Sequence, residues 1–410
     1  MKIMTPAAGS QKRGALALPN YAVALVIGAL AILSAVFLAK DTDFKVYWYG
    51  IRFFLDGTQP LYGPKSGIRY PQEFRYPPVT VLFFLPFTYL SLRAASMCWI
   101  VGAWAACAYV TKLAIRTWRL TFSAGGILFG LVLLVPYIVL AVKFGNVQPY
   151  LVALVFAAML WADEHPERAG IALAVAICFK VWPLVFVPWL LRRPRTLYAA
   201  GIATAVLWML PVWFFGWHYY LFLLQDFYTH AAALASGPEA VWYSSQSLRG
   251  VLLRLLTNTV PPRDGYPDLS FATLPPGLIA GCYVLIAAII YGYSLFQMWR
   301  SSPYRRFEWE ALAFVLFSAL QPFCLNSSLI SLLPAILMGA HIYSSPGQYP
   351  PSSRRWFLVA CGLSIVATLT PIRHLQRDLV MLGTYLWIML ALGISLMIAA
   401  LSKERPASEN

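Results

Sequence analysis

The chain has 410 residues, of which 60% are hydrophobic and only 11% are charged. A soluble domain cannot bury that much apolar surface, so the composition excludes a soluble enzyme and indicates a polytopic membrane protein. The net charge of +15 comes from Lys and Arg residues that gather in short clusters between apolar runs, a positive-inside pattern that predicts membrane lipids and no nucleic acid as partners.

The first apolar run covers residues 21–39, contains no charge and is long enough to span a membrane. Residues 1–20 are polar and basic, and no small-residue cleavage signal follows the run. We therefore expect an uncleaved anchor with a cytoplasmic N-terminus. Asp41 and Asp43 come directly after the run, which predicts that both carboxylates emerge at the external surface of the membrane.

The external loop that follows is rich in aromatic residues, most of which we expect to form an interfacial belt. They are Tyr47, Trp48, Tyr49, Phe53, Phe54, Tyr62, Tyr70 and Tyr76. Within residues 43–56 the apolar positions recur at helical spacing, which predicts a short helix on the membrane surface. Asp43 stands at the start of that helix, so the alternative to a chemical role is an N-cap.

The next two apolar segments are predicted from about Pro77 to Leu90 and over residues 94–111. The basic residues Lys112 and Arg116 then require a cytoplasmic position, which a simple hairpin from an external loop does not allow. We therefore expect one of these two segments to be re-entrant.

Residues 120–142 are uncharged and predict another crossing, which ends just before Asn146 and Gln148. Both amides are candidate substrate contacts. The alternative for Asn146 is a helix cap.

An apolar run over residues 169–191 contains Lys180 and Pro183. An ionised lysine within such a run costs roughly 2.5–3.5 kcal/mol unless it is paired or hydrated. Because proline breaks a helix, we expect two half-helices to meet at Lys180 and to point its ammonium group into a cavity that suits a phosphate.

Further crossings are predicted over 196–217, 277–299, 356–372 and 379–402. The uncharged residues 311–344 would measure about 50 Å as one helix, so we expect two helices that break near Gln321-Pro322. Arg373 and Arg377 are one helical turn apart and can share one anion, with lipid head groups as the alternative ligand.

The basic clusters predict a single integral membrane domain over residues 21–402, with external loops at 41–76 and 218–271. Residues 1–20 and 403–410 are expected in the cytoplasm. The six cysteines all lie inside apolar runs without a Cys-x-x-Cys pair, so we expect no disulfide, metal site or cofactor.

Four short motifs resemble those of one enzyme family: Asp-Phe-x-Val-Tyr from Asp43, Phe-x-Tyr-Pro-Pro from Phe74, Lys-x-x-Pro from Lys180 and Gln-Ser-Leu from Gln246. Together they resemble glycosyltransferase family 87, whose members are GT-C enzymes that take sugars from polyprenyl phosphates. Actinobacterial mannosyltransferases acting on phosphatidylinositol mannosides belong to it. The resemblance implies an all-α GT-C fold with about 10–13 transmembrane or re-entrant helices.

The resemblance implies that Asp43 is the catalytic base, and Asp41 is its local rival. The lysine within the apolar run, Lys180, is the candidate site for the donor phosphate together with Arg373 and Arg377. The candidate substrate-binding residues are Tyr76, Asn146, Gln148, Gln246 and His374.

The chain also departs from the family pattern. Asn146 stands where the family has glutamine, and Ser245 precedes Gln246 where the family has asparagine. Residues 325–328 replace a stretch that usually carries a tryptophan, an acidic residue and histidine. If that histidine assists proton transfer, this protein does so otherwise or handles a different substrate.

These features predict an inverting glycosyltransferase, a hexosyltransferase that moves a hexose or pentose, with mannose favoured, from a polyprenyl-phosphate sugar. The acceptor is expected to be a glycolipid, a polysaccharide or another cell-envelope molecule. Transfer needs a carboxylate that takes the proton of the acceptor hydroxyl and fixed cations that stabilise the departing phosphate, and it needs no metal. We expect a multi-pass protein of the plasma (inner) membrane whose active site faces the periplasm or cell exterior.

Two other classes of protein compete with this prediction. The sequence has no Gly-rich phosphate loop, which argues against a nucleotide-sugar donor. The alternative function is a transporter or flippase of lipid-linked saccharides, for which Lys180 beside a broken helix would be a substrate site. Such a protein should show paired internal repeats, and the two halves of this chain show none, so the large external loops favour the transferase.

Overall fold

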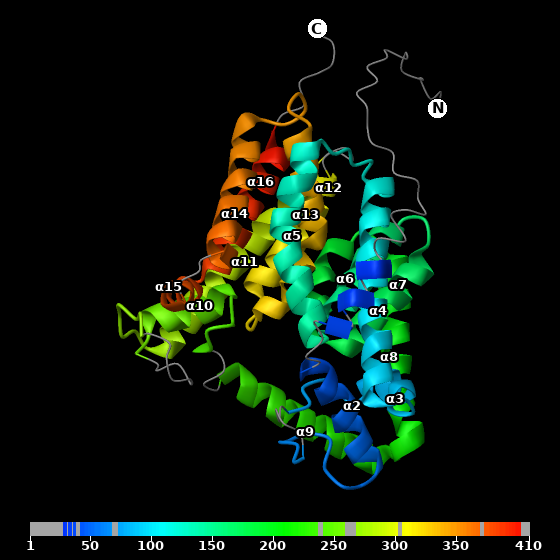
Figure 1. Cartoon of the computed structure of the whole chain (residues 1–410). Coiled ribbons are helices and arrows are strands. Elements are labelled where there is room, and N and C mark those ends of the chain that lie inside the picture. Colours follow the sequence, from blue (N-terminus) through cyan, green and yellow to red (C-terminus); the bar gives the residue numbers. More distant parts are fainter. Residues whose placement is uncertain are drawn as a thin grey trace.

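The structure, a computed structural model, describes residues 28–30, 32–34, 36–37, 42–67, 73–236, 241–258, 268–301, 306–369 and 373–402. Regular structure in these ranges is helical, apart from one bridge that pairs Ser245 with Leu325 (Figure 1). In chain order the helices are α2 (Thr42–Leu55), α3 (Thr80–Thr88), α4 (Leu92–Thr117), α5 (Ala124–Phe144), α6 (Gln148–Trp161), α7 (Pro166–Phe179), η1 (Trp182–Phe186), η2 (Pro188–Leu190), α8 (Pro194–Phe215), α9 (Trp217–Ser236), α10 (Leu248–Leu256), α11 (Pro276–Arg300), α12 (Arg306–Leu320), η5 (Asn326–Leu332), α13 (Leu333–Ser344), α14 (Pro351–Leu369), α15 (Arg373–Met381) and α16 (Thr384–Leu401).

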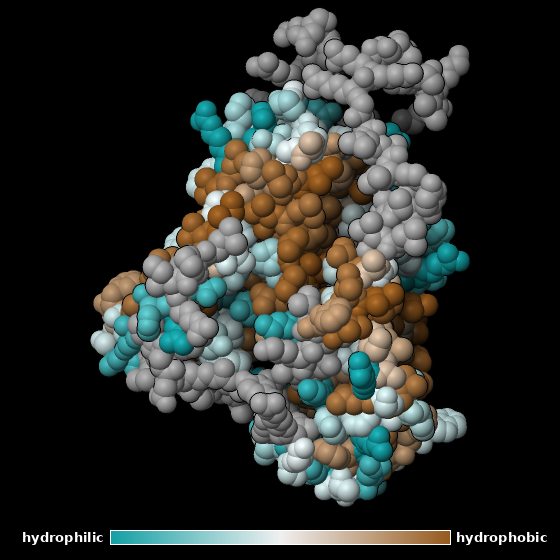
Figure 2. All heavy atoms as spheres, viewed as in Figure 1, coloured by the Kyte–Doolittle hydropathy of each residue, from teal (hydrophilic) through white to brown (hydrophobic). Residues whose placement is uncertain are grey.

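Six helical segments of the described residues are long and apolar enough to cross a membrane. They are α4, α5, α8, α11, η5 with α13, and α16. A broad hydrophobic face covers the middle of the molecule in Figure 2, between hydrophilic residues at its two ends. Large side chains on these helices point outward, such as Ile202 on α8 and Ile289 on α11, as expected for surfaces that contact lipid. The predicted all-α membrane architecture is therefore confirmed.

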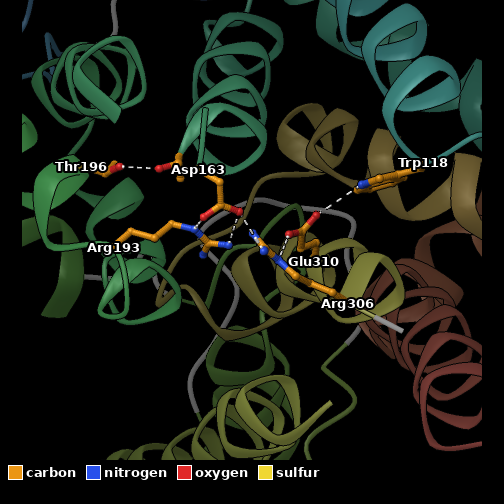
Figure 3. Close-up of polar contacts among 7 residues, drawn as sticks. Trp118, Asp163, Arg193, Thr196, Arg306 and Glu310 are labelled. Atoms are coloured by element: carbon orange, nitrogen blue, oxygen red, sulfur yellow. Dashed lines mark hydrogen bonds and ion pairs between the residues drawn. The ribbon is translucent and has the colours of Figure 1, made fainter. Parts of the chain in front are cut away.

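One end of the bundle is defined by a network of charged residues, which we call the polar end (Figure 3). Asp163, just after α6, accepts hydrogen bonds from Arg193 before α8 and from Arg306 at the start of α12. Arg306 also donates to Glu310, which receives a further hydrogen bond from Trp118 after α4. These contacts show that α4 and α6 end on the same side on which α8 and α12 begin.

Of the two segments that follow the first loop, α3 is too short to span a membrane, and its re-entry into the membrane stays a prediction. It has nine residues, which span about 14 Å at 1.5 Å per residue and cannot cross a hydrocarbon core of about 30 Å. The next helix, α4, has 26 residues and runs from the neighbourhood of α3 to the polar end (Figure 1). Lys112 and Arg116 therefore lie toward the polar end, where the basic clusters require them to be.

Both expected helix breaks are present. Helix α12 ends at Leu320 and η5 begins at Asn326, so the break includes Gln321 and Pro322 as predicted. Helix α7 ends at Phe179, and Lys180 adopts an extended conformation with φ −145° and ψ 143° before η1. Proline explains both breaks because it lacks an N–H group and clashes with the preceding turn.

Four of the eight aromatic residues expected in an interfacial belt are buried in the protein, and another, Tyr70, lies outside the described residues. The predicted short helix is present as α2, but its Tyr47 and Trp48 are buried, and so are Tyr62 and Tyr76. Tyr47 stacks on Phe84 of α3 with ring centroids 4.6 Å apart. The loop folds back over the ends of the helices, so these rings pack into the protein core instead of the lipid interface.

Candidate active site

The carboxylate of Asp43 lies against the end of α5. Asp43 is in the first turn of α2, and its Oδ2 atom accepts a hydrogen bond of 2.9 Å from Asn146 Nδ2. Gly145, which caps α5 with φ +69°, permits this approach. A Cβ atom on Gly145 would lie 2.8 Å from Phe44 Cβ, so a larger residue would push α2 away from Asn146.

The side chain of Asn146 also binds the first residue of the next helix. Its Oδ1 atom accepts a hydrogen bond of 2.8 Å from the backbone N–H of Gln148, the first residue of α6. Its Nδ2 atom donates a second, longer hydrogen bond of 3.4 Å to Ser327 Oγ on η5. The N-cap of α6 is Val147, so Asn146 lies one residue before the cap position. Its amide accepts the N–H of the first residue of the helix and also contacts the predicted base.

The positive charges of two residues lower the pKa of Asp43. Lys180 lies between α7 and η1 with its Nζ atom 5.8 Å from the ring centroid of Tyr76, and the hydroxyl of Tyr76 is 2.8 Å from that of Tyr47. The positive charges of Lys180 and Arg75 both favour the ionised form of Asp43. Asp43, Lys180 and Arg75 thus form one charged cluster at the end of the bundle opposite to the polar end.

The electrostatics of this cluster suit a base. The pKa of Asp43 is raised to about 6, because burial of the carboxyl group outweighs the opposing effects of the hydrogen bond from Asn146 and of the charges of Lys180 and Arg75. Burial and the nearby Asp43 raise the pKa of Tyr76, so this residue stays a neutral phenol near neutral pH. A carboxylate with a pKa close to the working pH combines an ionised form with useful proton affinity.

The family profile described as glycosyltransferase family 87 matches residues 74–327, which is more than half of the chain. The chain belongs to glycosyltransferase family 87. Among solved structures it is similar to one described as ArnT from Cupriavidus metallidurans bound to undecaprenyl phosphate, with a TM-score of 0.42 and 16% sequence identity. That similarity covers 93% of this chain and 78% of the ArnT chain. Among curated proteins, no sequence matches.

The family 87 match contains Lys180, Asn146 and Ser327 but begins after Asp43. The role of Asp43 therefore depends on its contacts in the structure and on the short motif that begins with it. The structure brings together four of the residues singled out from the sequence: Asp43, Tyr76, Asn146 and Lys180.

Other predicted site residues lie elsewhere or stay untested. Gln246 donates from Nε2 to the carbonyl oxygens of Tyr243 and Val380, which ties its segment to α15. Gln148 is buried at the start of α6, and His374 is exposed on α15. Asp41 and the side chain of Arg373 lie outside the described residues. The expected cavity shared by Lys180, Arg373 and Arg377 therefore stays a prediction.

Two residues near Asp43 were not expected from the sequence. Ser327 lies in the stretch where the family histidine is absent, yet it contacts Asn146. The bridge between Ser245 and Leu325 holds that stretch beside the segment that precedes α10. The second unexpected residue is Arg75, whose charge lowers the pKa of Asp43. Its position before Tyr76, within the Phe-x-Tyr-Pro-Pro motif, is the only sequence signal that points to it.

Proposed function

We propose that this family 87 member is an inverting glycosyltransferase that moves a hexose or pentose, with mannose favoured, from a polyprenyl-phosphate sugar to a lipid-linked or cell-envelope acceptor. The observation that carries the proposal is the cluster in which the half-buried Asp43 carboxylate meets the positive charges of Lys180 and Arg75. Family membership supports glycosyl transfer over the alternative of a transporter or flippase.

The cluster supplies the groups that a direct displacement needs. The Asp43 carboxylate takes the proton of the acceptor hydroxyl while the hydroxyl oxygen attacks the anomeric carbon. The bond between that carbon and the phosphate oxygen breaks, and its electron pair leaves with the polyprenyl phosphate. Lys180 and Arg75 stabilise the departing charge, and the single displacement inverts the anomeric configuration.

The direct test is sugar transfer by the purified protein. We expect label to pass from one member of a panel of radiolabelled polyprenyl-phosphate hexoses and pentoses into a lipid extract that supplies acceptors. The same mixture without the protein provides the background. If every donor in the panel gives only that background, the proposed donor class is wrong.

We also propose that the Asp43 end of the bundle faces the periplasm or cell exterior and that the protein resides in the plasma membrane. Support comes from the positive-inside rule, because the polar end carries the basic residues Arg193 and Arg306. A lipid-linked donor presents its head group at the membrane surface. The position of Asp43 at the end opposite to the polar end supports this orientation.

The first prediction tests this orientation with single cysteines in a variant lacking the native ones. Ser66 and Glu164 are exposed near opposite ends of the bundle. We expect a membrane-impermeant maleimide to label Ser66→Cys in intact cells and to label Glu164→Cys only after permeabilisation. The reverse pattern would invert the proposed topology.

The second prediction concerns the donor phosphate. Lys180→Met removes the ammonium group that approaches Tyr76 and acts on Asp43. Because hydrogen bonds to charged groups contribute about 1.5–3 kcal/mol, we expect donor affinity to fall by roughly 10–100-fold, with a smaller effect on acceptor affinity.

Separate titrations of donor and acceptor in detergent measure the two effects. The matched control is Lys112→Met, an exposed lysine of α4 toward the polar end, which should leave donor affinity unchanged. Equal losses for donor and acceptor in Lys180→Met would contradict a phosphate-specific role.

A further inference from the structure

The amide of Asn146 is almost fully occupied by the protein itself. A side-chain amide offers two N–H donors and a carbonyl oxygen with two lone pairs. In Asn146 the donors reach Asp43 and Ser327, and the oxygen accepts the N–H of Gln148. The residue is 3% exposed, so no N–H of the Asn146 amide is left to bind a sugar hydroxyl.

The contact with Gln148 also fixes which way the amide faces. A backbone N–H can only donate, so the atom of Asn146 that faces it must be the carbonyl oxygen. The nitrogen then faces Asp43 and can only donate to it. A donor that cannot accept stabilises the ionised carboxylate over the protonated acid.

The partners of Asn146 come from well-separated parts of the chain. Asp43 lies on α2, Asn146 at the junction of α5 and α6, and Ser327 on η5. Gly145 lets α2 pack directly on this junction. The position of the carboxylate is therefore set by helices of the bundle and not only by the loop that follows α2.

We propose that Asn146 is a positioning residue that holds the Asp43 carboxylate ionised and fixed, and that Ser327 in turn holds Asn146. This inference rests on the proposed role of Asp43 as the base. It assigns to the amide a function other than the substrate contact that the sequence suggested, and it gives a role to the serine found where the family histidine is missing.

The test uses Asn146→Asp, which keeps the size of the side chain and an oxygen that caps Gln148. The substitution replaces the donor to Asp43 with a second carboxylate, and two carboxylates that share a site cannot both ionise easily. We expect the pH of half-maximal turnover to rise by roughly one to two units, with activity recovering at high pH.

Other charged and titratable groups act on Asp43 and remain in the variant. They are Lys180 after α7, Arg75 before α3, and Tyr47 and Tyr76 beside the carboxylate. Because they are unchanged, a shift of the pH profile reports the exchange of the amide donor at position 146 for a carboxylate. A purely structural role would lower turnover equally at every pH.

The matched control is Asn326→Asp, the same chemical change at the residue beside Ser327. The profile of this control should stay close to that of the parent protein. An equal shift in the control would overturn the inference, since added charge and not the lost hydrogen bond would then explain the result.

Failure of this inference can be told from failure of the proposed function. If no donor of the panel supports transfer, the proposed function fails. If Asp43→Asn keeps its turnover, the transferase function stands but Asp43 is not the base, and the positioning role of Asn146 falls with it. If Asp43→Asn is inactive and the profile of Asn146→Asp does not move, only the positioning role of Asn146 is wrong.

Discussion

Asp43→Asn is expected to lower turnover by about 10²–10⁴-fold, the usual contribution of a positioned general base. Asparagine has nearly the same size as aspartate and can still accept the hydrogen bond from Asn146, so the fold around α2 should be retained. It cannot take a proton from the acceptor hydroxyl. Initial rates with saturating donor and the melting temperature should be measured on the same preparation.

The control variants separate a base from a helix cap. Asparagine caps helices almost as well as aspartate, so a capping role predicts near-normal turnover for Asp43→Asn and a loss of about 1 kcal/mol in stability for Asp43→Ala. Asp56→Asn, near the end of α2, removes an exposed carboxylate that pairs only loosely with Arg52 at 3.9 Å. That control should keep full turnover and stability.

The pH profile gives a second measure of the same residue. The base acts only when ionised, and burial raises the pKa of Asp43 to about 6. Turnover should therefore be half-maximal near pH 6, reach its plateau about one unit higher and fall about tenfold per pH unit well below pH 6. A profile that stays flat to pH 4 would mean that Asp43 does not carry the proton.

Local sequence patterns predicted most of the secondary structure and part of the site. Proline at positions 183 and 322 predicted where helices break, because the reason for the break is local. Asp43 was found because it follows an uncharged apolar run within a recognisable motif. Lys180 stands out because a cation inside an apolar run needs a compensating partner. In the structure the negative charge of Asp43 favours the ionised form of this lysine.

What the sequence did not predict depends on contacts between distant residues. Tyr47 and Tyr76 have the composition of an interfacial belt, but whether the loop lies on lipid or on protein is decided by its packing against α3. Ser327 is 181 residues from Asn146 in the chain, and no local pattern signals that contact. From the sequence, the missing family histidine indicates only that the site lacks a group. In the structure the same stretch provides Ser327, whose hydroxyl accepts a hydrogen bond from the Asn146 amide.

The largest expected effect on stability is that of Arg306→Met at the polar end. Arg306 donates to Glu310 Oε1 at 2.7 Å and to Asp163 Oδ2 at 3.0 Å (Figure 3). The side chain of Glu310 is only 4% exposed, whereas that of Asp163 is 57% exposed. Removing Arg306 leaves Glu310 buried with the weak 3.3 Å bond from Trp118, so we expect a loss of about 3–5 kcal/mol.

Unfolding by sodium dodecyl sulfate in mixed micelles measures this loss, and two further variants identify its cause. Asp163→Asn should cost less than about 1 kcal/mol because exposed ion pairs contribute little. Arg306→Met combined with Glu310→Leu should regain most of the stability, since no buried charge is then left without a partner. If the double variant is as unstable as Arg306→Met alone, the lost packing of the arginine and not the stranded carboxylate is responsible. The Asp43 cluster lies at the opposite end of the bundle, so turnover per folded molecule should be unchanged in all three variants.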